Sequence, residues 1–395
     1  MGANQCDSMA SMADPEALLT REAAELLAHL RDGVPRTRAQ LVELAGLARS
    51  TVSSRLDALL ETGLVAPAGG GVSSGGRPPG YFAFQPAARI LLAIDLGATH
   101  GVVALTDLAG SVLELESASL DIADGPLPVL DWVLDAAERL RSRSGRPATD
   151  LVGVGIGLPG PVEHVTGIPT NPPIMPGWDG FDVPAYIRTR FDVPVLVDND
   201  VNLLALGEHA TVWKTVDDLL FVKVATGIGA GIISGGRLQR GAQGTAGDLG
   251  HVRVPFTQRT PKHGDADADL EALASGPGIA RGLGIHGIEA NSSRDVVELA
   301  GLGDARVTDA IRQAGRELGE VLSACVNILN PSVIVIGGSI ARAGEQLIAG
   351  VREVVYGQST PLATRHLTIT ESRAGETGGV VGAATMVIQH LLDPA

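Results

Sequence analysis

Residues 225–251 (ATGIGAGIISGGRLQRGAQGTAGDLGH) form the part of the chain best suited to bind a small polar ligand. Nine of these 27 residues are glycine, and the first ones follow the apolar run 219–224 (LLFVKV), which predicts a buried strand. Glycines in this position let backbone N–H groups approach an anion that a Cβ would keep away. The run ends in Asp248 and His251, which can meet the hydroxyls of a small molecule. Hairpin turns alone would explain the glycine pair at 235–236, but not the whole run.

Three more apolar runs predict strands that each end in a glycine turn. They are residues 91–96 (LLAIDL), 151–158 (LVGVGIGL) and 333–336 (VIVI). The polar and glycine residues at their ends are Asp95, Gly97 and Thr99, then Gly157 and Gly160, then Gly337 and Gly338. Strands that alternate with helical segments and deliver such turns predict an α/β architecture with its ligand at the strand ends.

The order of these motifs resembles the ROK family (repressors, open reading frames and kinases) from about residue 90 to the C-terminus. The resemblance is carried by Asp95-x-Gly97-x-Thr99, Asn199-Asp200-Val201-Asn202, the glycine-rich run and Gly337-Gly338. It implies a two-lobed actin-like ATPase domain of the sugar-kinase type over residues 89–395. The smaller lobe is expected at about 89–198 with a C-terminal helix at about 380–395, and the larger lobe at about 199–379.

The resemblance also implies roles for individual residues. Asp200, which follows the predicted strand 193–197, matches the aspartate that takes the proton from the attacking sugar hydroxyl, and a carboxylate beside a strand end suits such a general base. An N-cap or loop carboxylate is the alternative, and it fits Asp198 better. The implied sugar ligands are Asn199, Asp200, Asp248, His251 and Glu271. The implied nucleotide contacts are Asp95, Gly97, Thr99, Thr226, Gly227, Gly229, Gly337 and Gly338.

Several positions depart from the family pattern. Ala98 and Ala225 replace usual glycines, and His100 stands where kinases commonly carry lysine or another ligand-compatible residue. The added methyl groups hinder close approach of a phosphate to the backbone, so ATP and Mg²⁺ are expected only if kinase activity is retained. Asp248 replaces the family's longer glutamate. Ile174 stands where the family often has a sugar-binding asparagine, which favours a less polar or modified ligand.

The segment after His251 lacks the family's structural zinc ligands. Family members often continue with Cys-x-Cys-Gly-x-x-Gly-Cys-x-Glu, whereas residues 255–271 here contain no cysteine. Structural zinc and a metal site are therefore predicted to be absent, which leaves His251 free to serve the sugar. A hard-cation site would be the alternative to a solvated loop, and its candidate ligands are His263, Asp265, Asp267 and Asp269.

Residues 15–88 predict a winged helix-turn-helix domain. Helices are expected at 15–30, 38–45 and 49–62, with Thr37 as an N-cap and Gly46 in the tight turn between the second and third. Strands at 64–65 and 81–84 would flank a glycine-rich wing. The expected DNA contacts lie on the second and third helices and in the wing: Arg38, Arg49, Ser50, Thr51, Ser53, Ser54, Arg55 and Arg77. A helical packing module without a nucleic-acid role is the alternative.

Charge and composition agree with a regulator of this kind. The chain of 395 residues has a net charge of −15, yet residues 31–90 carry seven arginines against four acids. A basic module on an acidic body is typical of a DNA-binding appendage. No apolar run is long enough to span a membrane, residues 1–14 predict a disordered tail without a secretion signal, and two cysteines favour a reducing cytoplasm.

The sequence therefore predicts a cytoplasmic, sugar-responsive transcriptional regulator, most simply a repressor of carbohydrate genes. It would bind operator DNA as a homodimer or higher oligomer and sense a sugar or sugar derivative between its lobes. The competing hypothesis is an ATP-dependent sugar kinase, alone or combined with regulation, because Asp200 is present. A constitutive DNA binder with a vestigial second domain is a further alternative.

Overall fold

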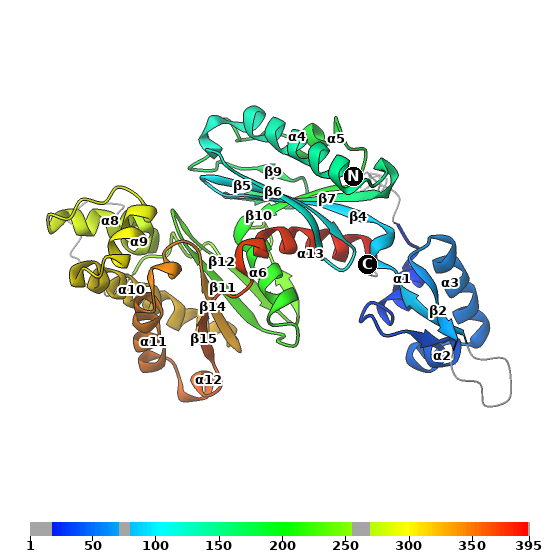
Figure 1. Ribbon diagram of the computed structural model, residues 1–395. Coiled ribbons are helices and arrows are strands. Elements are labelled where there is room, and N and C mark those ends of the chain that lie inside the picture. Colours follow the sequence, from blue (N-terminus) through cyan, green and yellow to red (C-terminus); the bar gives the residue numbers. More distant parts are fainter. Residues whose placement is uncertain (1–17, 71–79, 255–268, 394–395) are drawn as a thin grey trace, which may run out of the picture.

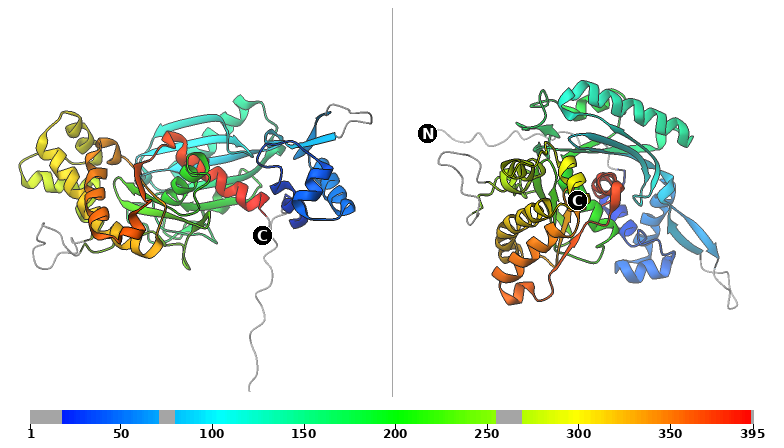
Figure 2. Two further views of the ribbon diagram at one scale, coloured as in Figure 1. Left: turned by 90° about the horizontal axis from the view of Figure 1, so that it is seen from below. Right: turned by 60° about the vertical axis from the view of Figure 1, so that its left-hand side comes forward.

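The computed structural model describes residues 18–70, 80–254 and 269–393. A helical module with a small sheet is followed by two five-stranded mixed sheets, each covered by helices (Figure 1). The N-terminal module and the helices α8–α11 lie at opposite ends of the molecule (Figure 2). The predicted tail, the wing tip with Arg77 and residues 255–268 lie outside the described residues.

The N-terminal module contains the three predicted helices, and local chemistry sets their ends. They are α1 (Arg21–Ala28), α2 (Arg38–Ala45) and α3 (Arg49–Glu61). Thr37 and Gln40 form a reciprocal capping box at the start of α2, and Gly46 ends that helix at φ 65°. Val52, Leu56 and Leu59 of α3 are buried and form its core face, whereas Leu44 of α2 is 50% exposed.

Antiparallel strands complete this module, in the order β1-β3-β2. They are β1 (Arg36–Thr37), β2 (Val65–Gly70) and β3 (Gly80–Phe84), so β2 and β3 occupy the places predicted for the wing strands. Leu64 and Val65 are buried together with Leu27 and Leu30 from the first helical segment. Helix, turn, helix and β-ribbon thus form the winged helix-turn-helix fold predicted from the sequence.

The first large sheet has the strand order β10-β7-β4-β5-β6. Its strands are β4 (Ile90–Leu96), β5 (His100–Asp107), β6 (Val112–Ser119), β7 (Leu151–Leu158) and β10 (Val195–Asn199). Helix α4 (Pro126–Ser144) packs on β5 and β6, while α13 (Gly378–Leu392) packs on β4 and β7. The chain's last helix therefore returns to strands from a much earlier part of the chain. The short elements β8 (Val162–Glu163), β9 (Ile168–Pro169) and α5 (Val183–Arg188) complete this lobe.

The second large sheet has the order β13-β12-β11-β14-β15. Its strands are β11 (Leu219–Val224), β12 (Ile228–Ser234), β13 (Arg237–Gln239), β14 (Val333–Gly337) and β15 (Thr368–Glu371). One side packs against α6 (Asp200–Thr211). The helices of this lobe are α7 (Leu270–Ala274), α8 (Gly276–Ile285), α9 (Ser293–Gly301), α10 (Ala305–Leu329), α11 (Gln346–Gln358) and α12 (Pro361–Thr364).

Helices α6 and α13 cross in close contact between the two sheets (Figure 1). A Cβ on Gly207 would collide with the carbonyl oxygen of Gly378, and one on Gly382 would collide with that of Leu203. Glycine at these positions lets the two backbones touch. The fully buried Glu208 of α6 also accepts hydrogen bonds from Ser372 and from the backbone amides that lead into α13. The two helices therefore form one joint between the lobes.

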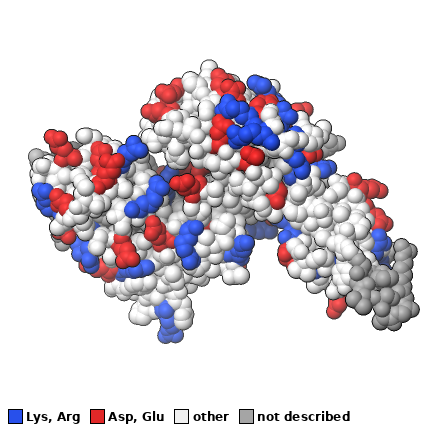
Figure 3. All heavy atoms as spheres, in the orientation of Figure 1, with Lys and Arg blue, Asp and Glu red and all other residues white. Residues whose placement is uncertain are grey.

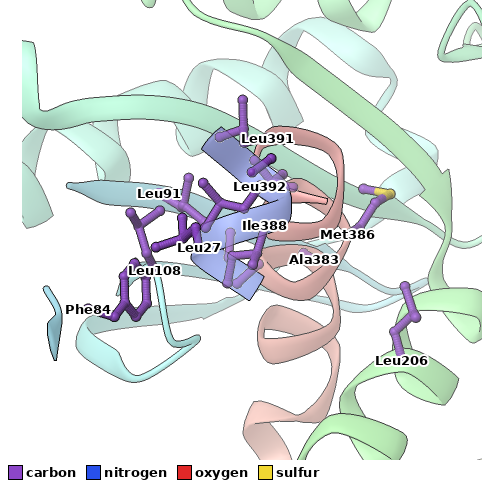
Figure 4. Close-up of a cluster of buried hydrophobic side chains, with 14 of the residues drawn as sticks. Leu27, Phe84, Leu91, Leu108, Leu206, Ala383, Met386, Ile388, Leu391 and Leu392 are labelled. Carbon is purple, nitrogen blue, oxygen red and sulfur yellow. The ribbon is translucent and has the colours of Figure 1, made fainter. Parts of the chain in front are cut away.

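A continuous hydrophobic core connects this joint to the N-terminal module. Leu27 of α1 and Phe84 of β3 belong to the same buried cluster as Leu91, Ile388 and Leu392. Figure 4 shows these side chains gathered around the C-terminal end of α13. The guanidinium of Arg31 also pairs with Asp393, directly after α13. The N-terminal module is thus packed on the second domain through its last helix and is not tethered by a linker alone.

Candidate functional site

An ion pair between Asp200 and Lys223 lies at the centre of the candidate cleft. Asp200 is the first residue of α6, and its Oδ2 accepts a hydrogen bond from Nζ of Lys223 in β11. The side chains are only 6% and 21% exposed. Burial lowers the pKa of Lys223, but attraction to Asp200, the hydrogen bond and the nearby Asp95 raise it above its ordinary value. The ammonium therefore stays charged in the cleft.

Asp95, at the end of β4, supplies a second carboxylate from the other lobe. The residue is 8% exposed, and a Cβ on Gly379 at the start of α13 would collide with its Oδ2. Burial, reinforced by the charge of Asp200, raises the pKa of Asp95 to about 7, although Lys223 opposes this shift. Two carboxylates thus lie near one ammonium, so a single positive charge cannot balance both negative charges.

His100 covers the turn that was expected to hold a phosphate. A Cβ on Gly97 would collide with the imidazole ring of His100, so the ring lies directly over this glycine. Partial burial of the ring, followed by the charge of Lys223, lowers the pKa of His100. Arg342, after β14, adds a further positive charge close enough to lower the same pKa. Gly97 therefore accommodates a side chain of the protein itself.

The predicted sugar ligand Asn199 already has two protein partners. Its Oδ1 accepts a hydrogen bond from the amide of Val201, which makes it the N-cap of α6, and its Nδ2 donates to the carbonyl oxygen of Gly160 at 2.8 Å. These bonds fix the residue that directly precedes Asp200. The N-cap role proposed as an alternative for the neighbouring acids belongs to Asn199.

Asp198 is a buried network centre, which corrects the expectation of a loop or cap carboxylate. It is the second-last residue of β10, is 3% exposed and accepts a hydrogen bond from Nε of Arg240 at 2.7 Å. The side-chain amide of Asn202 and the backbone amide of Asn199 bind its other oxygen. Nδ1 of His164 lies 3.6 Å from Oδ2 of Asp198. Burial of the imidazole ring, and after it the charge of Arg240, lowers the pKa of His164.

Glu271 lies beside the beginning of β12. Its Oε2 accepts a hydrogen bond from the amide of Ile228 at 2.9 Å, and a Cβ on Gly227 would approach this oxygen to 2.8 Å. A Cβ on Gly229, on the same face of the strand, would contact Val201 next to Asp200 at 3.4 Å. Glu271 therefore lies beside the beginning of β12, and Val201, the neighbour of Asp200, lies beside the next residues of the same strand.

Asp248 and His251 are both exposed at the end of the glycine-rich run. Nδ1 of His251 lies 3.6 Å from Oδ2 of Asp269, while the hydrogen bonds of Asp248 to described residues come from its backbone. No direct contact joins His251 to Asp200 within the described residues. Their predicted presence in a shared sugar site remains a prediction.

Packing explains several glycines that were assigned to nucleotide binding. A Cβ on Gly337 would approach the ring of Phe221 to 2.6 Å, and Gly338, at φ 92°, packs against the carbonyl of Val224. Thr99 and Thr226 are exposed at the turns after β4 and β11. These residues lie at or just after strand ends, and their contacts with a nucleotide remain predictions.

The metal prediction can be examined only in part. Within residues 18–70, 80–254 and 269–393, no three His, Cys, Asp or Glu side chains are grouped as metal ligands. His263, Asp265 and Asp267 lie outside these ranges, and Asp269 caps α7 by accepting from the amide of Ala272. In the same ranges, no helix has the length and apolar character required to cross a membrane.

Most arginines of the N-terminal module are paired with acids. Arg38 contacts Asp57 at 2.8 Å, and Arg55, expected to face outward, is only 17% exposed and contacts Glu25 of α1 at 2.9 Å. Positive and negative side chains are accordingly interspersed on the face shown in Figure 3. Arg49 is exposed at the start of α3 and has no ion pair or side-chain hydrogen bond to another described residue. The remaining predicted contacts on α3 are the exposed Ser50 and Ser54 and the half-buried Thr51 and Ser53.

Sequence reasoning missed the two basic partners, Lys223 and Arg240. Lys223 was read only as part of a buried strand, although an ammonium in the apolar run LLFVKV signals a buried counter-ion. Arg240 gave no comparable signal, because its partner Asp198 is 42 residues away in the chain.

Fold and site together define a two-lobed, actin-like protein of the sugar-kinase type that carries a winged helix-turn-helix. The ROK family model matches residues 91–390. The chain belongs to the ROK family, as the resemblance of its motifs predicted.

Relatives that are regulators match almost the whole chain. It is 29% identical over 369 residues to the xylose repressor of Bacillus spizizenii, covering 93% of this chain and 95% of the relative. The crystal structure of a ROK family transcriptional regulator, a homologue of the Escherichia coli Mlc protein, gives a TM-score of 0.80 at 26% identity. It covers 95% of this chain and 97% of that one.

Kinases of the family match only the second part. The ROK hexokinase of Thermus thermophilus, at 28% identity and a TM-score of 0.61, covers 75% of this chain and 97% of its own. The regulators therefore account for the N-terminal module as well as the two lobes.

Proposed function

We propose that this protein is a sugar-responsive transcriptional repressor of carbohydrate genes. The N-terminal winged helix-turn-helix binds operator DNA, and the cleft around Asp200 binds a sugar or sugar derivative. The observation that carries the proposal is the shared core of α1 and α13, because it joins the expected DNA-binding module to the helix that starts at the cleft.

Helix α13 can transmit the state of the cleft. Its 15 residues span about 22 Å. Gly379, near one end, touches Asp95, whereas Ile388 and Leu392, near the other end, share a core with Leu27 of α1. A rigid helix with contacts at both ends must tilt or shift when either end moves. Ligand binding that changes the crossing of α6 and α13 would therefore change the position of α1.

A sugar alters DNA affinity only if it binds two conformations of the protein differently. Closure of the two lobes about the α6–α13 joint provides these conformations. The protein would act as a cytoplasmic homodimer or higher homo-oligomer, since two-fold symmetry lets two modules read a palindromic operator. The predicted operator contacts are led by Arg49, which is exposed and unpaired among the described residues.

The retained Asp200 supports one competing function, an ATP-dependent sugar kinase. A carboxylate at the first turn of α6 and a second one at Asp95 are the groups that such a reaction needs. The kinase would have to use Asp200 as a base while Lys223 is bound to it.

DNA binding with and without sugars tests the proposal. The full-length protein would be titrated into fluorescent fragments of its own promoter region, alone and with xylose, glucose or N-acetylglucosamine, without nucleotide. We expect specific binding to one fragment and release by one sugar. A protein that ignores every fragment, or binds one irrespective of all sugars tested while converting sugar and ATP to a sugar phosphate, would contradict it.

A further inference from the structure

Lys223 occupies the part of the cleft where phosphoryl transfer would take place. In β11 it lies directly between Gly229 of β12 and Gly337 of β14, its register partners on either side. Both glycines are among the residues expected to contact a nucleotide. The side chain leaves this central position and reaches Oδ2 of Asp200, the predicted general base.

The Lys223 ammonium faces acidic groups on both sides of the cleft. Asp200 is its hydrogen-bond partner, and Asp95 from the opposite lobe also acts on its charge. These are the carboxylates that a divalent cation and a transferring phosphoryl group would approach. A fixed ammonium repels a divalent cation at short range, and its bond to Asp200 occupies one of the two oxygens that could accept the hydroxyl proton.

His100 is a second side chain that hinders the binding of a nucleotide. His100 lies over Gly97, the turn after Asp95, and replaces the open backbone that a phosphate needs. Arg342 is close enough to influence His100. The residues of the site therefore do not fit a bound Mg²⁺–nucleotide, because the Lys223 ammonium is bonded to Asp200 and the exposed His100 ring lies over Gly97.

We propose that Lys223 is a resident cation that replaces the divalent ion of a kinase and converts the cleft into a nucleotide-independent sugar site. Lys223 holds Asp200 as a fixed hydrogen-bond acceptor for a sugar hydroxyl and places a positive charge where a divalent cation would have to bind. This inference rests on the proposed sugar-sensing function, but it concerns the cleft alone and can fail separately.

The test replaces the ammonium and asks whether a metal takes its place. Thermal unfolding of the full-length protein would be followed at pH 8 with increasing Mn²⁺, for the wild type, Lys223→Met and Lys223→Ala. Removal of the ammonium leaves Asp95 and Asp200 without a counter-ion, and two carboxylates are enough to attract such a cation. We expect the apparent affinity for Mn²⁺ to rise about tenfold or more in both variants.

Two controls keep the result specific. Lys214→Ala removes an exposed lysine elsewhere in the chain and should leave Mn²⁺ affinity unchanged. Lys223→Met combined with Asp200→Asn should lose the gain, because one of the two carboxylates is then neutral.

A direct measurement on the wild type keeps the inference testable even if the variants do not fold. Titration calorimetry with Mg²⁺ and a non-hydrolysable ATP analogue should show no binding at millimolar concentration. Binding of that analogue by the wild type, or equal Mn²⁺ affinity in the wild type and folded Lys223 variants, would overturn the assignment. Neither readout involves DNA, so failure here is distinguishable from failure of the repressor function.

Discussion

Asp198 and Asp200 are two residues apart, and both are buried next to a basic side chain, but their surroundings differ. The side chain of Asp198 is 4% exposed and binds Arg240, and it also accepts hydrogen bonds from Asn202 and the amide of Asn199. Asp200 is 6% exposed and binds Lys223, but Asp95 lies near the same ammonium. One carboxylate is balanced by one guanidinium, whereas two carboxylates share one ammonium.

This difference separates a structural ion pair from a ligand site. A buried charge that is fully hydrogen-bonded has little left to offer a ligand, and removal of one of its partners costs stability because the other charge is left buried and unpaired. In a site with more carboxylates than cations, the like charges repel one another. Ligand hydroxyls that donate hydrogen bonds to these carboxylates would stabilise them. We therefore expect changes at Asp198 to act mainly on folding and changes at Asp200 mainly on ligand response.

The largest stability effect is expected from Arg240→Met. The substitution leaves Asp198 buried without its cation, and loss of one partner of a buried pair costs about 3–5 kcal/mol. Urea unfolding measures the change. Arg237→Met, at an exposed position in β13 just before Arg240, is the matched control and should change stability by less than about 0.5 kcal/mol. Equal effects of the two substitutions would show that the Asp198 network is not a structural pair.

Asp95→Asn should stabilise the protein in a pH-dependent way. The pKa of Asp95 is raised to about 7 in the folded chain, mainly by burial. A carboxyl with a raised pKa favours folding below its unfolded value near 4, and this contribution is lost as pH rises through 7. Asn removes the buried charge, so its benefit should be absent near pH 4 and reach roughly 2–4 kcal/mol at pH 8.

Unfolding curves of the wild type and Asp95→Asn at several pH values test this prediction. Asp192→Asn neutralises an exposed carboxylate and serves as the control. A stability difference independent of pH, or one that grows toward acid, would contradict the assignment of a raised pKa to Asp95.

Arg49→Ala should weaken operator binding by roughly 1–3 kcal/mol if the guanidinium contacts a base through two hydrogen bonds. Arg55→Ala should weaken it less, because Arg55 is held by Glu25. Fluorescence anisotropy with the promoter fragment provides both values. A larger loss for Arg55 than for Arg49 would mean that the ion pair with Glu25 opens on DNA.

The smallest effect is expected at the contact between α13 and the N-terminal module. Arg31 and Asp393 are 26% and 43% exposed, and solvent screens such pairs. Arg31→Gln should therefore change the stability of folding by less than about 1 kcal/mol, and salt should reduce the difference further. A larger loss in urea unfolding would show that this pair, rather than the apolar core, holds α1 on α13.

The sequence was sufficient where local chemistry decides. Thr37 and Gly46 mark the limits of α2 because a cap and a left-handed turn need only neighbouring residues. Apolar runs located the strands β4, β7, β11 and β14. The sequence could not reveal three ion pairs, because each joins segments that meet only after folding. They are Asp198 with Arg240, Asp200 with Lys223, and Arg55 with Glu25 of α1.

One measurement tests the central claim most directly: the affinity for operator DNA with and without the active sugar, in Asp200→Asn and in Asp198→Asn. We predict that Asp200→Asn binds DNA within about threefold of the wild type but no longer responds to sugar. Asp198→Asn should unfold at a lower temperature yet keep the sugar response when folded. A normal sugar response in Asp200→Asn, or its loss only in Asp198→Asn, would contradict the account.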